Sequence, residues 1–271
     1  MKIDDLFSVK GLSAVVTGGA SGIGRAIAGA LADNGAKVTL FDLNAEAAEA
    51  TANALSREGA EIRWARVDAT DEAVLKTAFA DVAGRDGLDV VYANAGISGG
   101  PGFLTFDRER NPPAAIEAIA PDFFDRVVSV NLGSVFRTIQ AAVPHLKARG
   151  GGRVIVTSSI SATRVETFVG TPYVASKAAV AQFVRQIALE LARYSITVNA
   201  IAPGPVATGI AGGRLQDPAT QSRFAEHCPM HRIGVAEDVV GAALFLASPS
   251  ARFITGAEIL IDGGVTLGVA D

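Results

Sequence analysis

Short apolar segments rich in β-branched residues alternate with longer helical segments along nearly the whole chain of 271 residues. Most of the apolar segments lack polar alternation, which is typical of strands covered on both faces. They are residues 13–17, 37–42, 62–67, 89–93, 153–158, 196–201 and 258–262. The segments predicted to be helical are residues 23–35, 45–59, 71–84, 121–150 and 173–194. This alternation predicts an α/β fold, a doubly wound parallel sheet with helices on both faces.

Several predicted helices end at a glycine, the usual helix stop, at Gly35, Gly59, Gly84 and Gly150. No linker or internal repeat interrupts the chain, which predicts a single domain over residues 1–271. Residues 97–120 and 203–234 are irregular, and both follow predicted strands. Because ligands of open α/β sheets bind beyond the carboxyl ends of strands, we expect walls or lids of a substrate site there. A surface insertion is the alternative for each.

Composition favours a protein of the cytoplasm. The net charge is −4 without a basic block, so we expect no nucleic-acid partner. No segment reaches the roughly 20 apolar residues of a membrane span, and the N-terminal residues do not resemble a signal peptide. The single cysteine, Cys228, cannot form an internal disulfide. His227 and His231 lack acidic or cysteine partners, so we expect no metal site.

A glycine-rich turn follows the first predicted strand and opens the first helix. Gly18, Gly22 and Gly24 lie in the segment TGGASGIG, with Ser21 and Ile23 between them. Glycines let the backbone turn tightly and approach a pyrophosphate at the positive end of a helix. A plain strand-to-helix turn would also use glycine, but this placement favours a dinucleotide.

Two aspartates follow the next two predicted strands. Asp42 ends the second strand, where a carboxylate can accept hydrogen bonds from ribose hydroxyls and repel a 2′-phosphate. This position favours NAD(H) over NADP(H), although Arg25 is a nearby cation. Asp68 ends the third strand and could accept a hydrogen bond from an adenine amine. For both residues, a role in capping a turn is the alternative.

Tyr173 and Lys177 lie four residues apart at the start of an alanine-rich helix, so they share one face. A phenol with a pKa of about 10 is a poor base, and a nearby ammonium would lower that pKa. The alternative is a packed tyrosine beside a lysine that extends to solvent.

The motifs TGGASGIG, YANAG, VTSS, YVASK and APGPVAT occur in this order between about residues 8 and 264. In this combination the chain resembles the classical short-chain dehydrogenase/reductase family. The resemblance implies a single Rossmann-like domain with a seven-stranded parallel sheet, a homotetramer or homodimer, and nicotinamide-dependent oxidation of alcohols or reduction of carbonyls. A Val156 and a long 97–120 connection depart from the family pattern, and the connection leaves the substrate open.

The resemblance also implies roles by position. Ser159 corresponds to the catalytic serine, with Ser158 and Ser161 as alternatives, and Tyr173 and Lys177 complete the set with Asn131. Asn131 corresponds to a helix asparagine that holds a relay water, and an exposed or kinked position is its alternative. The further expected cofactor contacts are Asn94, Ala95, Gly96, Pro203, Gly204, Val206 and Thr208.

The expected substrate is a small secondary alcohol or ketone. Ser159, Ile160, Ser161, Phe168 and Tyr173 are expected to line its pocket. Phe103, Leu104, Phe106 and Ile210 of the two irregular segments are expected to contribute. Arg164 could meet an anionic group, and a solvated outward position is its alternative. A sugar or polyol dehydrogenase, a 3-oxoacyl-thioester reductase and a non-catalytic NAD-binding sensor are the other functions considered.

Overall fold

Seven strands form one parallel sheet in the order β3-β2-β1-β4-β5-β6-β7 in the computed structural model. The structure describes residues 2–57, 60 and 62–268. The strands are β1 (Ser13–Thr17), β2 (Lys37–Asp42), β3 (Ile62–Arg66), β4 (Val90–Ala93), β5 (Gly152–Thr157), β6 (Ile196–Pro203) and β7 (Glu258–Ile261). The order changes direction between β1 and β4, which is where a doubly wound sheet opens a crevice at its carboxyl edge. The predicted Rossmann-like fold is confirmed.

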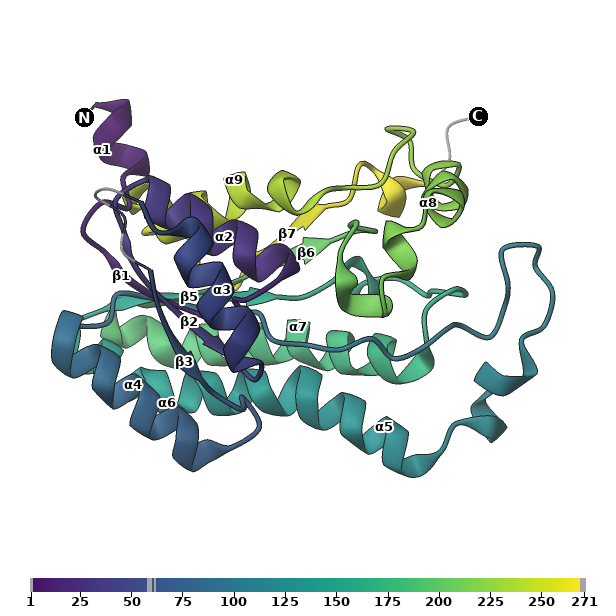
Figure 1. Ribbon diagram of the computed structural model, residues 1–271, viewed down its shortest axis with the longest axis horizontal. Helices are drawn as coiled ribbons and strands as arrows, with labels where there is room; N and C mark the ends of the chain where they lie inside the picture. The colour runs from purple at the N-terminus through teal and green to yellow at the C-terminus, as the bar shows by residue number, and fades with distance from the viewer. Residues whose placement is uncertain (1, 58–59, 61, 269–271) are drawn as a thin grey trace.

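Helices cover both faces of the sheet (Figure 1). The helices are α1 (Ile3–Phe7), α2 (Gly22–Asp33), α3 (Ala45–Leu55), α4 (Glu72–Asp86), α5 (Pro121–Val128), α6 (Ser134–Arg149), α7 (Thr171–Leu191), α8 (Pro218–Ala225) and α9 (Ala236–Ala247). In the view of Figure 1, α2 and α9 lie above the sheet, and α4, α6 and α7 lie below it.

Neighbouring residues of the central strands belong to two separate cores. Val15 and Val91 pack with the apolar faces of α4, α6 and α7. Ala14, Val16 and Tyr92 pack with α2 and α9 on the opposite side. Because both faces of the sheet are buried in this way, the strands need apolar residues at every position, which explains their sequence pattern.

The helix predicted over residues 121–150 is divided by a π-helical turn. α5 ends at Val128, the turn spans Ser129–Gly133, and α6 begins at Ser134. The turn contains Asn131, whose side chain is fully buried. Such turns insert one extra residue into a helix and are frequent at functional sites.

Three of the four predicted helix stops need comment. Gly84 does not end its helix, because α4 continues to Asp86 and is capped by Gly87, which has a φ of 75°. Gly150 is the left-handed cap of α6 as predicted. Gly59 lies outside the described residues, and α3 ends earlier, at Leu55.

Helices α8 and α9 were not predicted, and α8 shows that part of the irregular 203–234 segment is helical. Among the residues described, no helix combines the length and hydropathy that crossing a membrane requires.

Candidate active site

A cavity of about 1420 Å³ lies at the carboxyl edge of the sheet. This exceeds the roughly 300–1,000 Å³ of a pocket for one small ligand, so it has room for a dinucleotide and a substrate. Nearly all the predicted site residues line it: Gly18, Ser21, Gly22, Ile23, Asp42, Asp68, Asn94, Ala95, Gly96, Ser159, Ile160, Ser161, Phe168, Tyr173, Lys177, Pro203, Gly204, Val206 and Thr208. Gly24 and Asn131 do not line the cavity. They pack behind its wall.

The glycine turn forms one end of the cavity. Gly18 and Gly22 have φ values of 62° and 51°, the left-handed conformation that glycine adopts without strain. A Cβ on Gly24 would lie 2.2 Å from the Gly18 carbonyl oxygen, so Gly24 lets the turn close upon itself. A Cβ on Gly22 would face the Thr208 methyl group at 3.3 Å, which places Thr208 across from the turn. The first residues of α2, Gly22 and Ile23, line the cavity, and the amides at this positive end of the helix suit a pyrophosphate.

Asp42 joins the glycine turn to the end of β2. One carboxylate oxygen accepts a hydrogen bond from the Ala20 amide at 3.0 Å, and the other accepts one from the Asn44 amide at 3.0 Å. Asp42 therefore caps its own loop, yet it also lines the cavity. The adjacent Leu43 side chain is exposed and carries no charge. The residue in register with Asp42 on β3 is Arg66, which is exposed. The Asp42 carboxylate itself suits ribose hydroxyls better than a phosphate.

Asp68 is held by its own turn. Its carboxylate accepts hydrogen bonds from the Thr70 hydroxyl and amide, at 2.6 and 2.8 Å. These bonds lower the pKa of Asp68. The turn-capping alternative is therefore correct, and the carboxylate also lines the cavity.

Asn94 links three strands beneath the cofactor end of the cavity. Its amide nitrogen donates to the carbonyl oxygens of Thr17 and Gly18 at 3.1 and 3.2 Å. Its side-chain oxygen accepts from the Thr157 hydroxyl at 2.9 Å. Asn94 thus fixes the glycine turn to the ends of β4 and β5.

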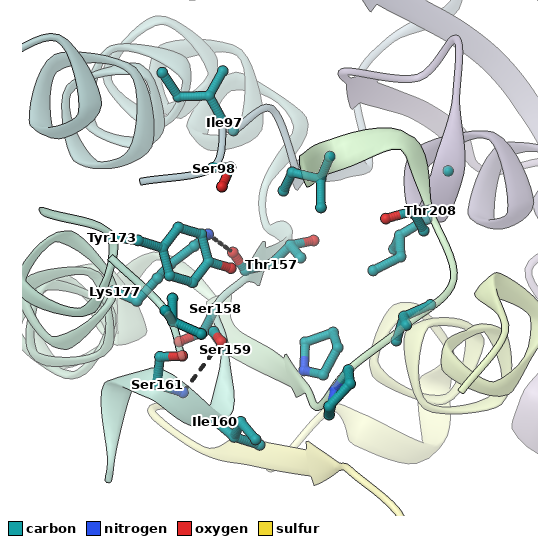
Figure 2. A pocket seen from close by; sticks show the side chains of 18 of the residues that line it. Ile97, Ser98, Thr157, Ser158, Ser159, Ile160, Ser161, Tyr173, Lys177 and Thr208 are labelled. Carbon is teal, nitrogen blue, oxygen red and sulfur yellow. Dashed lines mark hydrogen bonds between the residues drawn. The ribbon is translucent and has the colours of Figure 1, made fainter. Parts of the chain in front are cut away.

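Tyr173 and Lys177 lie side by side near Ser159 at the other end of the cavity (Figure 2). The Lys177 ammonium donates a hydrogen bond to the Thr157 carbonyl oxygen at 2.7 Å and lies 5.6 Å from the centre of the Tyr173 ring. Burial lowers the pKa of Lys177 to about 8. The alternative of a lysine extended to solvent is wrong, because only 4% of Lys177 is exposed.

The protonation of Tyr173 differs from the prediction. Burial raises the pKa of the phenol above its usual value, a hydrogen bond with Ser159 lowers it, and the charge of Glu166 raises it. The expected lowering by Lys177 does not dominate, because the ammonium is directed at the Thr157 carbonyl and the phenol is withdrawn from water. The Ser159 hydroxyl oxygen also accepts a hydrogen bond from the Ser161 amide at 3.1 Å (Figure 2).

Asn131 connects the π-helical turn to the segment after β4. Its side-chain oxygen accepts from the Ile97 amide at 2.8 Å, and its nitrogen donates to the Ile97 carbonyl at 3.0 Å. The nitrogen also approaches the Ser176 hydroxyl at 3.2 Å, and that hydroxyl donates to the Tyr173 carbonyl. The alternative of an exposed Asn131 is wrong, because its side chain is buried. The alternative of a local irregularity in the helix is correct. Asn131 braces Tyr173 from behind the cavity.

The two irregular segments meet at the substrate end. Segment 97–120 also contacts the residues before α7, where the Leu104 amide donates to the Thr167 carbonyl oxygen and the Gly170 amide donates to the Gly100 carbonyl oxygen, both at 3.1 Å. The Phe106 ring lies 4.7 Å from the Phe168 ring and 4.8 Å from the Phe224 ring of α8. The pocket prediction holds for Leu104 and Ile210, which line the cavity. It is wrong for Phe106 and Phe103, which are not among its lining residues. Phe106 packs behind Phe168 because its ring completes an aromatic stack.

Two cavity residues were missed by the sequence interpretation. His227 was interpreted as an ordinary loop residue, but it lines the cavity and stacks on Phe168 with 5.8 Å between ring centres. Glu166 also lines the cavity, and its carboxylate pairs with Arg164 at 3.3 Å. Only their positions in the chain could have indicated a place in the cavity. His227 follows β6, and Glu166 lies between Ser159 and Tyr173. Within the described part of the chain, no group of three or more acidic, histidine or cysteine side chains is arranged to hold a metal.

Comparisons with known proteins agree with this geometry. The family model described as enoyl-(acyl carrier protein) reductase matches residues 18–266. The chain is 32% identical over 268 residues to 5-keto-D-gluconate 5-reductase of Escherichia coli, covering 98% of this chain and all of the relative. It is 37% identical over 254 residues to cis-4-hydroxycyclohexanecarboxylate dehydrogenase of Sinomonas cyclohexanicum, covering 93% and 96% of the two chains.

Solved structures show the same fold. A gluconate 5-dehydrogenase from Burkholderia cenocepacia, in complex with NADP and tartrate, superposes with a TM-score of 0.86 at 31% identity. The match covers 98% of this chain and 99% of that one. The glycine turn, the Ser159, Tyr173 and Lys177 cluster and these matches together establish that the chain belongs to the short-chain dehydrogenase/reductase family.

Proposed function

We propose that this protein transfers a hydride between NAD(H) and a small secondary alcohol or ketone, with Ser159 and Tyr173 acting on the substrate oxygen and Lys177 beside the phenol. The observation that carries the proposal is their position in one cavity with the glycine turn and Asp42. The cavity thus joins a site suited to a dinucleotide to a site suited to proton transfer. We also propose that segments 97–120 and 203–234 are the substrate walls of a single domain.

The bound nicotinamide would supply the hydride chemistry, and the protein would handle the proton. In ketone reduction, the Ser159 hydroxyl donates a hydrogen bond to the carbonyl oxygen and stabilises its developing charge. Tyr173 then gives its proton to that oxygen. Burial raises the pKa of Tyr173, which keeps on the phenol the proton that reduction needs. Lys177 holds its ammonium beside the phenol and stabilises the phenolate that forms.

Cofactor preference follows from Asp42. The carboxylate lines the cavity and would repel the 2′-phosphate of NADP(H), so NAD(H) is proposed as the cofactor. Because the relative from Burkholderia cenocepacia contains NADP, the preference of this protein for NADH or NADPH has to be measured. We expect the wild-type protein to bind NADH at least about tenfold more tightly than NADPH. Asp42→Asn should narrow this ratio, whereas the control Asp68→Asn should leave it unchanged. Tighter binding of NADPH by the wild type would contradict the proposal.

Turnover distinguishes an enzyme from a protein that only senses NAD. NADH oxidation should be followed with acyclic and cyclic ketones. Tyr173→Phe should bind NADH with wild-type affinity yet lose about 10²–10⁴-fold in kcat, the usual range for a missing general acid. Tight NADH binding by the wild type without turnover of any ketone would favour the sensor. Wild-type rates in Tyr173→Phe would refute the phenol assignment.

We further propose a homotetramer or homodimer that works in the cytoplasm. Phe123, Phe124 and Phe136 are exposed on α5 and α6, as are Leu189 on α7 and Leu260 on β7. Such apolar positions suit contacts between copies of the chain. Light scattering coupled to size-exclusion chromatography should give two or four times the mass of one chain.

A further inference from the structure

An arginine and a glutamate form an ion pair on the wall of the substrate end. The Arg164 Nε lies 3.3 Å from a carboxylate oxygen of Glu166, and both residues line the cavity that contains Tyr173. The Glu166 side chain is 12% exposed and that of Arg164 is 37% exposed. Another nitrogen of Arg164 donates to the Val265 carbonyl oxygen from the C-terminal segment. The guanidinium is therefore held by two partners on different segments.

This pairing removes Arg164 as a free receptor for anions. An incoming carboxylate would have to displace Glu166 from the guanidinium or settle beside a second negative charge. Like charges at close range in a poorly hydrated site oppose binding strongly. The influence of Glu166 reaches the reacting end of the site, since its charge raises the pKa of Tyr173.

The other arginines of the cavity do not offset this effect. Arg108, Arg126 and Arg214 line the cavity but are exposed residues at its rim. Charges that face water are weakened by solvent and salt, so they attract anions only weakly. The inner wall is apolar instead, with Leu104, Ile160, Phe168, Leu215 and Phe224.

We propose that Glu166 is a specificity-determining residue, which occupies Arg164 and restricts the site to uncharged alcohols and ketones. The inference rests on the proposed function and names its substrate class. It predicts discrimination against carboxylate-bearing substrates of equal size and shape.

Ligand binding tests this directly. Cyclohexanecarboxamide and cyclohexanecarboxylate have nearly the same shape and differ in charge. Titration calorimetry on the protein with saturating NADH at a pH of about 8 should show about tenfold or greater preference for the amide. Glu166→Gln should improve carboxylate binding about tenfold and change amide binding less than about threefold. Glu190→Gln, at an exposed position of α7, is the matched control and should behave as the wild type.

Arg164→Gln separates the two possible roles of the arginine. It should leave Glu166 without its cation and weaken carboxylate binding relative to the wild type, while the amide still binds. Equal or tighter binding of the carboxylate by the wild type, no gain in Glu166→Gln, or failure of the wild type to bind the amide would overturn the inference. NADH affinity and melting temperature show that each variant is folded. Because the readout is binding, a failure of hydride transfer with every ketone would count against the proposed function and not against this inference.

Discussion

Replacing Lys177 by methionine should make the protein more stable while abolishing its activity. Lys177 is 4% exposed, and burial lowers its pKa from 10.5 to about 8. Each unit of pKa corresponds to about 1.4 kcal/mol, so holding the buried ammonium costs about 3 kcal/mol at neutral pH. Methionine has a similar length and no charge, so it can occupy the same space.

The gain is reduced by the hydrogen bond that the variant loses. The ammonium donates to the Thr157 carbonyl oxygen at 2.7 Å, and leaving that oxygen without its donor costs about 1 kcal/mol. The expected net effect of Lys177→Met is a free energy of unfolding about 2 kcal/mol higher than that of the wild type at neutral pH. This is large enough to measure by urea denaturation.

The sign of the pH dependence follows from the direction of the shift. Since the folded-state pKa is below that of the unfolded chain, the unfolded state holds more protons between pH 8 and 10.5, and wild-type stability rises across this window. The methionine variant lacks this rise. The gain in free energy of unfolding of Lys177→Met over the wild type should therefore be complete below a pH of about 8 and nearly absent at a pH of about 9.5. A variant that is no more stable at neutral pH, or an advantage that does not shrink, would refute this reasoning.

Three further variants test how the site is built. Asn131→Ala removes the bonds to Ile97 and Ser176 and should lower the free energy of unfolding by about 2–4 kcal/mol in urea titrations, more than Ser176→Ala does. Gly24→Ala would place a Cβ 2.2 Å from the Gly18 carbonyl oxygen and should weaken NADH binding at least about tenfold in fluorescence titrations. Its control is Gly84→Ala, where a Cβ would meet no atom within 4 Å. Phe106→Ala should raise KM for cyclic ketones about tenfold with unchanged NADH affinity, because Phe106 supports Phe168.

The sequence predicted the sheet well because its strands are buried on both faces. Continuous apolar runs are a strong signal, and all seven lie within one or two residues of their observed strands. Helix ends were less predictable. Gly84 has ample space and lies within α4, and the π-helical turn at Ser129–Gly133 leaves no mark on the apolar pattern. Helix α9 was missed, although it packs its apolar face on the sheet.

The cofactor end was more predictable than the substrate end, for a physical reason. A glycine turn and a strand-terminal acid act through backbone geometry at fixed places in the fold, so their spacing along the chain encodes their function. The substrate end depends on contacts between segments far apart in sequence, such as the stack of Phe106, Phe168 and His227. No local sequence pattern indicates whether a phenylalanine lines the cavity or packs behind another phenylalanine.

The charge of Tyr173 could not be obtained from spacing for the same reason. A separation of four residues correctly placed Lys177 next to the phenol, but the pKa depends on burial and on Glu166, seven residues earlier in a different segment. Burial acts on the two groups in opposite senses, raising the pKa of the phenol and lowering that of the ammonium. The two values therefore move apart, so the phenol holds its proton more firmly while the ammonium gives up its proton more readily. A pair arranged in this way needs a protonated phenol and an ammonium together, so ketone reduction should be fastest below the pH of about 8 at which Lys177 loses its charge.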